Sequence, residues 1–326
     1  YATVLLLNDV DAVIDTTRTD GNGNYSFADV DTEKTIRIRL RAESIQDTGP
    51  QQWELYVRDN TSDTGVALED RPVYEVQWSQ FTTGSNDITN ADYTARTGWS
   101  GGSYTGMRAA APMAILDSIM NGIQLINSVD PEVDIGRLDA FWSVNNTYSL
   151  SERWEDLEDN GQLVTAYYSS DPDNNGIRNP SLFLRGDAVG RFPESSINTD
   201  EFDSYVILHE WGHYFEDELA RSDSVGGYHQ IPGIVDARVA FGEGWGNAIG
   251  VIAQGTDQFG CDTTQPATAG SSLNVESYNS FFDEQGFFNE MSVATFLYDL
   301  WDSGIEGGDT GSIGFGPIYE TMTGFQ

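Results

Sequence analysis

The chain has 326 residues, of which 39% are hydrophobic and 12% aromatic. This length allows two domains, or one large domain with an appendage, and a sizeable core. The 52 acidic residues against 16 basic ones give a formal net charge of −36, which would repel nucleic-acid phosphates and anionic lipid headgroups. No apolar run reaches the roughly 18 residues of a transmembrane helix. We therefore exclude nucleic-acid binding, membrane-surface binding and membrane insertion as main functions.

The basic residues and the cysteine bear on the environment of the protein. Lys34 is the only lysine, so the remaining 15 basic residues are arginines. A very acidic, lysine-poor surface suits high salt, which screens self-repulsion. Cys261 is alone, which excludes an intramolecular disulfide and fits a cytosolic or an exported protein. The apolar run Val4–Leu7 is too short for a signal-peptide core. We expect a mature or trimmed fragment of an extracellular or cell-surface protein, and a saline habitat fits its composition.

The first 46 residues are expected to form a small all-β sandwich. Thr3–Leu7 is strand-like, and Asp20–Asn24 is a turn cluster typical of a hairpin. Tyr25–Phe27 and Thr35–Leu40 follow as strands, the latter alternating apolar residues with arginine at a period of two. This pattern resembles the carboxypeptidase regulatory-like (transthyretin-like) domains. The resemblance implies an incomplete β-sandwich domain of that kind over residues 1–46.

The rest of the chain is expected to contain a β-rich connecting region over residues 47–105 and an α+β domain over residues 106–326, cut short at its C-terminus. Within the connecting region, strands are predicted at 53–57 and 73–78. Further strands are predicted at 138–144, 163–168 and 181–185. Helices are predicted at 107–127, 203–220, 238–253 and 289–301 from their apolar periodicity and flanking cap residues.

Two of the three histidines lie four residues apart, in the segment His209-Glu210-Trp211-Gly212-His213. Positions i and i+4 of a helix share one face, so both imidazoles can reach one metal ion. Glu210 lies close enough to serve as a general base toward water, as in H-E-x-x-H zinc hydrolases. Because a glycine inside a helix costs about 1 kcal/mol relative to alanine, Gly212 indicates a close backbone approach.

A catalytic zinc ion needs a third protein ligand. The metzincin pattern would place a third histidine at the position that Leu219 holds, so that pattern is excluded. Asp236 and Glu243 remain as candidates. We prefer Glu243, because it opens an apolar helix 30 residues after His213. Asn247 lies one turn further along the same helix face, where it could hydrogen-bond a ligand imidazole.

These motifs, HEWGH and GEGWGN, resemble the signature of the fungalysin group of gluzincin zinc metallopeptidases, and more distantly that of thermolysin. The resemblance covers roughly residues 105–305 and implies a zincin-type fold built around an active-site helix. It implies that His209, His213 and Glu243 bind one catalytic Zn²⁺ and that Glu210 is the general base. Asn247 stands where the family has an aspartate that orients a ligand histidine, so ligand basicity is expected to be lower here.

The oxyanion formed during amide hydrolysis needs a stabilising group besides the metal. We take His229 and Tyr298 as candidate catalytic residues for this role, with Tyr228 and Tyr278 as alternatives. The gluzincin resemblance implies a downstream tyrosine or histidine, and the sequence does not single one out.

The segment Asp171–Gly176 matches the first six positions of a calcium-binding loop of the D-x-[DN]-x-[DN]-G type. Its twelfth position is Leu182 rather than glutamate, so the segment is not an EF-hand. We expect an Asx-rich turn without a metal here, with a Ca²⁺ site as the alternative.

Three functions fit these observations. The first is an exported zinc endopeptidase that acts on proteins or peptides. The second is a surface, adhesion or structural assembly protein that keeps a zincin fold with weak or no turnover. The third is a zinc hydrolase that acts on a non-peptide amide or ester. The intact Glu210 favours an enzyme, because a protein without turnover has no need of a general base.

Overall fold

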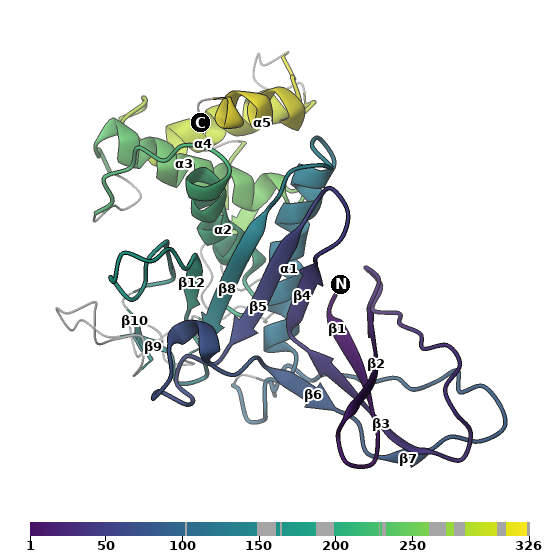
Figure 1. Cartoon of the computed structure of the whole chain (residues 1–326). Helices are drawn as coiled ribbons and strands as arrows, with labels where there is room; N and C mark the ends of the chain where they lie inside the picture. The colour runs from purple at the N-terminus through teal and green to yellow at the C-terminus, as the bar shows by residue number, and fades with distance from the viewer. Residues whose placement is uncertain are drawn as a thin grey trace.

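The structure is a computed structural model. It describes residues 1–101, 103–148, 161–163, 165–186, 199–227, 229, 233–260, 272–276, 284–304 and 311–324. Within these residues the chain is a mixed α+β protein, which confirms the predicted class. A β-rich N-terminal part adjoins a mixed sheet, and the helices gather on the far side of that sheet (Figure 1).

The N-terminal sheet is antiparallel throughout. Its core alternates along β3, because Ile36 and Ile38 are buried while Arg37 and Arg39 are half-buried. This confirms the predicted period of two. The sheet has the order β2 (Val13–Arg18), β1 (Thr3–Leu7), β3 (Thr35–Arg41) and β6 (Glu75–Gln77), with β7 (Phe81–Thr82) also paired to β3.

The predicted sandwich over residues 1–46 is wrong in two respects. The strands of residues 1–41 lie in a single sheet, whose apolar face is covered by side chains such as Tyr25 and Phe27 from an irregular segment rather than by a second sheet. The boundary after residue 46 also fails, because β4 (Glu43–Gln46) pairs with β5 (Trp53–Arg58) in the other sheet.

The chain passes from one sheet to the other at Ala42, which is fully buried between β3 and β4. Its backbone N–H donates to the carbonyl of Tyr74, and its carbonyl accepts from the N–H of Val57. Conversely, β6 and β7 come from the predicted connecting region and complete the N-terminal sheet. Pairing between distant segments decides this organisation, and the composition of each segment does not reveal it.

The central sheet is mixed. Its inner strands β5, β8 (Gly136–Trp142) and β12 (Ser181–Leu184) run parallel, and both outer strands, β4 and β11 (Tyr167–Ser169), run antiparallel to their neighbours. The order is β11-β12-β8-β5-β4. Shorter elements are η1 (Leu68–Asp70), the parallel pair β9 (Thr147–Tyr148) and β10 (Gln162–Leu163), and the antiparallel pair β13 (Gln258–Gly260) and β14 (Ser272–Asn274).

Both faces of the central sheet are covered, so its middle strands are buried on both sides. Leu138 and Ala140 of β8 face the helices, whereas Phe141 packs on the opposite face against Phe183 of β12 and Leu68 of η1. This explains why residues 138–142 are all buried. The buried stretch therefore does not alternate with exposed residues, and its one charged side chain, Asp139, pairs with Arg58 and Arg137.

The four predicted helices are present within a few residues of the predicted bounds, and a fifth helix was not predicted. α1 lies behind β5 and β8 (Figure 1). α2 packs between α1 and α3, and α4 packs on α3. None of the described helices is both long and apolar enough to cross a membrane. The helices are α1 (Ala111–Asn127), α2 (Ser204–Glu218), α3 (Ala237–Ile252), α4 (Glu290–Trp301) and α5 (Phe315–Thr323).

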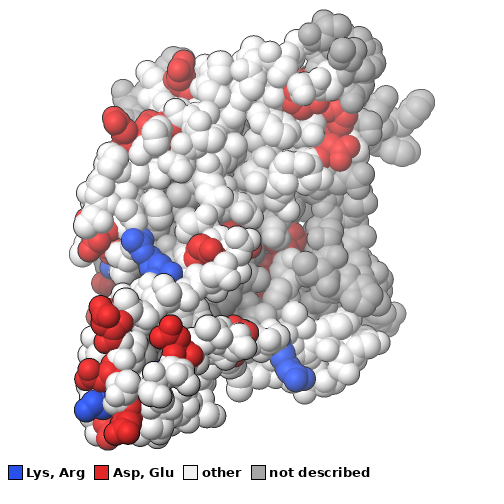
Figure 2. All heavy atoms as spheres, turned by 90° about the vertical axis from the view of Figure 1, so that its right-hand side faces the viewer, with Lys and Arg blue, Asp and Glu red and all other residues white. Residues whose placement is uncertain are grey.

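Side chains at the helix starts explain where three helices begin. Asp203 accepts hydrogen bonds from the N–H groups of Tyr205 and Val206 at the start of α2. Asp236 and Asn289 cap α3 and α4 in the same way. These acceptors satisfy backbone donors that lack a partner within the helix. Acidic side chains are also spread over the face of the molecule shown in Figure 2.

Candidate metal centre

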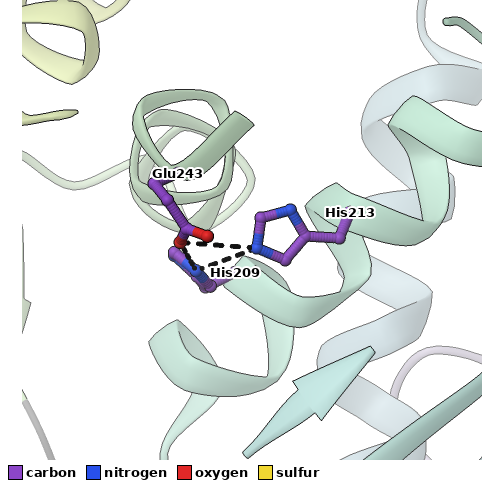
Figure 3. A group of neighbouring side chains, drawn as sticks. All are labelled: His209, His213 and Glu243. Atoms are coloured by element: carbon purple, nitrogen blue, oxygen red, sulfur yellow. Dashed lines mark hydrogen bonds and ion pairs between the residues drawn. The ribbon is translucent and has the colours of Figure 1, made fainter. Parts of the chain in front are cut away.

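α2 and α3 bring three candidate ligands together. His209 and His213 project from one face of α2, and Glu243 projects from α3 toward them (Figure 3). The Nε2 atoms of the two histidines are 3.2 Å apart. Glu243 Oε2 lies 3.2 Å from Nε2 of His209 and 3.6 Å from Nε2 of His213. The three donor atoms thus form a nearly equilateral triangle.

The triangle fits a tetrahedral zinc ion. Zinc bonds nitrogen at about 2.0–2.1 Å, so neighbouring ligand atoms of a tetrahedral site are about 3.3 Å apart. The three distances of 3.2, 3.2 and 3.6 Å match this value. Two imidazoles and a carboxylate are also a donor set that zinc prefers. His209, His213 and Glu243 could therefore hold one zinc ion.

Glycines on both helices allow this close approach. A Cβ on Gly246 of α3 would lie 2.9 Å from the His209 ring. A Cβ on Gly212 of α2 would lie 2.6 Å from Ile249 and 3.0 Å from the backbone of Gly246. The distances of 2.9 and 2.6 Å are shorter than real Cβ contacts, so alanine at either position would push the helices apart. The close backbone approach predicted from Gly212 is present.

Asn247 of α3 orients His209. Nδ1–H of His209 donates to Oδ1 of Asn247 at 3.0 Å, and the hydroxyl of Tyr205 donates to the same oxygen. An amide oxygen can only accept, so Nδ1 of His209 carries the proton and Nε2 is left with its lone pair toward the metal position. The sequence predicted the Asn247 contact, whereas Tyr205 was missed because its distance to Asn247 depends on how α2 and α3 pack.

Glu210 follows His209 directly, so it lies between the two candidate histidine ligands in the sequence. A zinc hydrolase would use a glutamate at this position as its general base. Its side chain is buried and lines the cavity at the metal centre. Burial, together with the nearby Glu243 and Asp200 carboxylates, raises the pKa of Glu210 to about 7, while His209 and His229 oppose the shift. A cation at the three donors would oppose this rise of the pKa. A carboxylate with such a pKa can both take up and release a proton near neutral pH.

A cavity of about 980 Å³ opens over the three donors. Its wall includes β11, the loop that follows β11, α2, the segment after α2, and α3. Among the described strands, β11 pairs only with β12, and its three residues line the cavity. An outer strand of a sheet can bind an extended peptide by main-chain hydrogen bonds. The sequence indicated a strand near here, but not that it lies at the edge of the sheet.

The loop after β11 is tied to the C-terminal end of α2. The hydroxyl of Tyr168 and Nη2 of Arg178 each lie 2.7 Å from Oδ2 of Asp217. Arg178 also pairs with Glu218. These contacts hold the cavity wall formed by residues 167–174 against the helix that carries both histidines.

Of the predicted oxyanion-stabilising residues that the structure describes, only His229 is found at the candidate metal centre. His229 reaches the centre, with Nε2 lying 3.3 Å from Oε1 of Glu243 and Nδ1 lying 3.2 Å from Oε2 of Glu290. Glu290 raises the pKa of His229, and burial opposes this shift. Glu290 was missed, because only the packing of α4 on α3 brings it there. Tyr228 and Tyr278 lie outside the described residues.

One prediction needs correction, and the alternative third ligand is not supported. Tyr298 is buried in the core against Trp301 and is not among the described residues that line the cavity. It lies eight residues after Glu290, or about 12 Å along the helix axis, which takes it away from the site. Asp236 is not a ligand in this arrangement, because its carboxylate caps α3 and pairs with Arg238 at 2.9 Å.

The segment Asp171–Gly176 forms a turn. The carboxylate of Asp171 accepts hydrogen bonds from the N–H groups of Asn175 at 3.1 Å and Gly176 at 2.7 Å. Asn174 has φ of +48° and Gly176 has φ of +79°, as left-handed positions in turns require. The Asx-rich turn is thus present, and the calcium alternative stays untested.

A comparison with protein-family models finds no match to this chain, and a comparison with curated proteins finds no similar sequence. Function is therefore inferred from the geometry and chemistry of the site.

Proposed function

We propose that this protein is an exported zinc-dependent endopeptidase of the gluzincin type, with a zincin-type fold. One observation carries the proposal. The donor atoms of His209, His213 and Glu243 form a triangle with the edges of a tetrahedral zinc site, and the buried Glu210 lies between the two histidines on the same helix. The HEWGH and GEGWGN motifs, which resemble those of fungalysins, support the same conclusion.

The reaction follows from the residues around this centre. Bound zinc would supply Lewis acidity, which polarises a carbonyl group and makes water a stronger acid. Glu210 accepts a proton from the attacking water while a C–O bond forms at the peptide carbonyl. It then returns that proton to the amine nitrogen as the C–N bond breaks, so the residue ends in its starting state. Asn247 and Tyr205 hold His209 in the required orientation throughout.

The cavity supports a peptide as the substrate. Tyr167, Tyr168 and Ser169 of β11, the outer strand of the described sheet, line it, and an extended chain could pair along this strand through main-chain hydrogen bonds. Such pairing is insensitive to side-chain identity, which suits an endopeptidase that acts on many proteins. A non-peptide ester or amide lacks the repeating N–H and C=O groups that this strand would recognise.

Metal content and cleavage test the proposal together. Zinc per chain is measured by mass spectrometry on the wild type and on Glu210→Gln, and both are assayed with casein. The matched control is Glu320→Gln, which makes the same change at an exposed position of α5. We expect about one zinc per chain in all three proteins and casein cleavage in the wild type and the control only.

Other outcomes would contradict the proposal in distinct ways. A folded wild type without zinc would overturn the ligand assignment and favour a surface or assembly protein. One zinc without cleavage of casein would favour the assembly protein with a zincin fold. Cleavage of small esters or amides, but of no peptide, would favour the non-peptide hydrolase.

A further inference from the structure

His229 contacts a different carboxylate through each of its ring nitrogens. Nε2 lies 3.3 Å from Oε1 of Glu243, and Nδ1 lies 3.2 Å from Oε2 of Glu290. Oε1 is the oxygen of Glu243 that does not face the two ligand histidines, since those approach Oε2. The imidazole therefore joins the outer oxygen of the third ligand to a second carboxylate.

Glu290 is held firmly at the far end of this chain of contacts. Its side chain is 6% exposed, and it is the first residue of α4. α4 can approach α3 this closely because residue 244 is glycine. A Cβ on Gly244 would lie 2.8 Å from the carbonyl oxygen of Glu290 and 2.5 Å from Val293. The packing of α4 on α3 thus places Glu290 beside the ligand helix.

This arrangement does not suit His229 as an oxyanion donor. A donor for the oxyanion needs an N–H aimed at the substrate, and both nitrogens of His229 face carboxylates. The arrangement does not suit a second metal ion bound by His229, Glu243 and Glu290 either, although one donor atom from each residue lies within 4.8 Å of the others. One ion cannot bind both nitrogens of one imidazole, so it could satisfy only one of the two observed contacts.

We propose that His229 is a positioning residue, which fixes the outer oxygen of Glu243 and is itself fixed by Glu290. The inference rests on the proposed zinc site and deepens it. Glu243 would otherwise be free to rotate about its last side-chain bond and to present either oxygen. Held through Oε1, it offers Oε2 alone, at the position that completes the triangle with His209 and His213. Outer contacts of this kind affect metal affinity by about 10–100-fold.

Two substitutions separate the contacts of His229. In His229→Gln, the amide nitrogen lies near the place of Nε2 and can still donate to Glu243. In His229→Asn, the amide nitrogen lies near the place of Nδ1 and can donate only to Glu290. Val225→Ala, at a position 59% exposed on the same segment, is the control. Zinc affinity is measured by competition with a chromogenic chelator, without substrate, and folding is checked by thermal unfolding of the zinc-free proteins.

We expect His229→Asn to bind zinc about 10–100-fold more weakly than the wild type, while His229→Gln and the control stay close to it. Equal zinc affinity in all four proteins, with turnover lost in both His229 variants, would overturn the proposal and make His229 an oxyanion donor. Two zinc ions per wild-type chain, falling to one in both variants, would overturn it in favour of a second metal. Zinc binding without peptidase turnover would refute the proposed function and leave this test valid.

Discussion

Gly246 lies directly against the imidazole of His209. A Cβ built on it would come within 2.9 Å of Cε1 and Nδ1 of the ring. Nδ1 is the atom that donates to Asn247 one residue further along α3. The missing side chain at 246 thus gives His209 the space in which to meet its orienting partner.

We expect Gly246→Ala to destabilise the protein and weaken zinc binding. Alanine is better than glycine inside a helix by about 1 kcal/mol, but forcing atoms into a packed site costs about 1–3 kcal/mol, and the ring must move. Gly316→Ala on α5 is the control, since its nearest neighbour would be at 3.8 Å. Chemical unfolding and zinc titration measure both effects. Unchanged zinc affinity in Gly246→Ala would show that the ring tolerates the shift.

Asn247 should control the basicity of His209. In Asn247→Asp, the added carboxylate would strengthen the interaction with Nδ1–H, so we expect tighter zinc binding. Asn247→Ala removes the acceptor, and we expect binding to weaken by about 10–100-fold. Tyr205→Phe removes only the second donor to Oδ1 and should have a smaller effect. Zinc competition assays rank the three proteins, and a loss of affinity in Asn247→Asp would contradict this account.

Arg178→Ala tests whether the loop after β11 serves substrate binding. Its side chain is 55% exposed, and exposed ion pairs contribute about 0–1 kcal/mol, so the free energy of unfolding should barely change. The cavity wall would be less firmly held against α2, so we expect KM for casein to rise with kcat nearly unchanged. The reverse pattern, a fall in kcat at constant KM, would place the effect in the chemistry instead.

Asp200 should make stability depend on pH. Burial raises its pKa from 3.8 to about 6, although Arg185 opposes the shift. The folded protein therefore binds this proton more tightly than the unfolded chain does, and the free energy of unfolding falls as pH rises from about 4 to about 6. Two pKa units correspond to at most about 3 kcal/mol.

Asp200→Asn should flatten this part of the profile. In the wild type, the backbone N–H of Arg185 donates a hydrogen bond to Oδ2 of Asp200 at 2.6 Å. The side-chain oxygen of asparagine can accept the same hydrogen bond. The pKa of Glu216, raised to about 7 with no contribution from Asp200, stays raised in both proteins. The Asp200 carboxylate contributes to the raised pKa values of Glu201 and Glu210, so the comparison rests on the acidic part of the profile. Urea unfolding of the zinc-free proteins between about pH 4 and 7 measures the free energy of unfolding of wild type and variant. Parallel profiles would contradict the shift.

Salt should stabilise the protein. The net charge of −36 produces self-repulsion in the folded state. Raising the ionic strength from about 0.1 to 1 M shortens the Debye length from about 10 to 3 Å, so we expect Tm to rise. NaCl and KCl should act equally if screening is the cause. A much larger effect of CaCl₂ at equal ionic strength would instead support a calcium site.

Local patterns predicted the helices well, and they picked out the three candidate ligands that the fold brings together. The spacing of His209 and His213 depends only on the pitch of a helix, and Glu243 opens a helix whose cap, Asp236, is visible in the sequence. The α+β class followed from the same periodicities. Sheet membership was predicted poorly, because pairing joins segments far apart in the chain, as β4 and β5 with β8 show.

The sequence by itself determined the chemistry available to this protein, since residue types and their helical spacing settle which donors share a face. Only the tertiary structure decided the contacts between separate elements. It placed Glu290 beside His229, set β11 at the edge of the cavity, and took Tyr298 away from the site. Helical spacing is a property of residues near one another in the chain, whereas these contacts depend on how separate elements pack. The contact of Glu290 with His229, for example, requires the close approach of α4 to α3 that Gly244 allows.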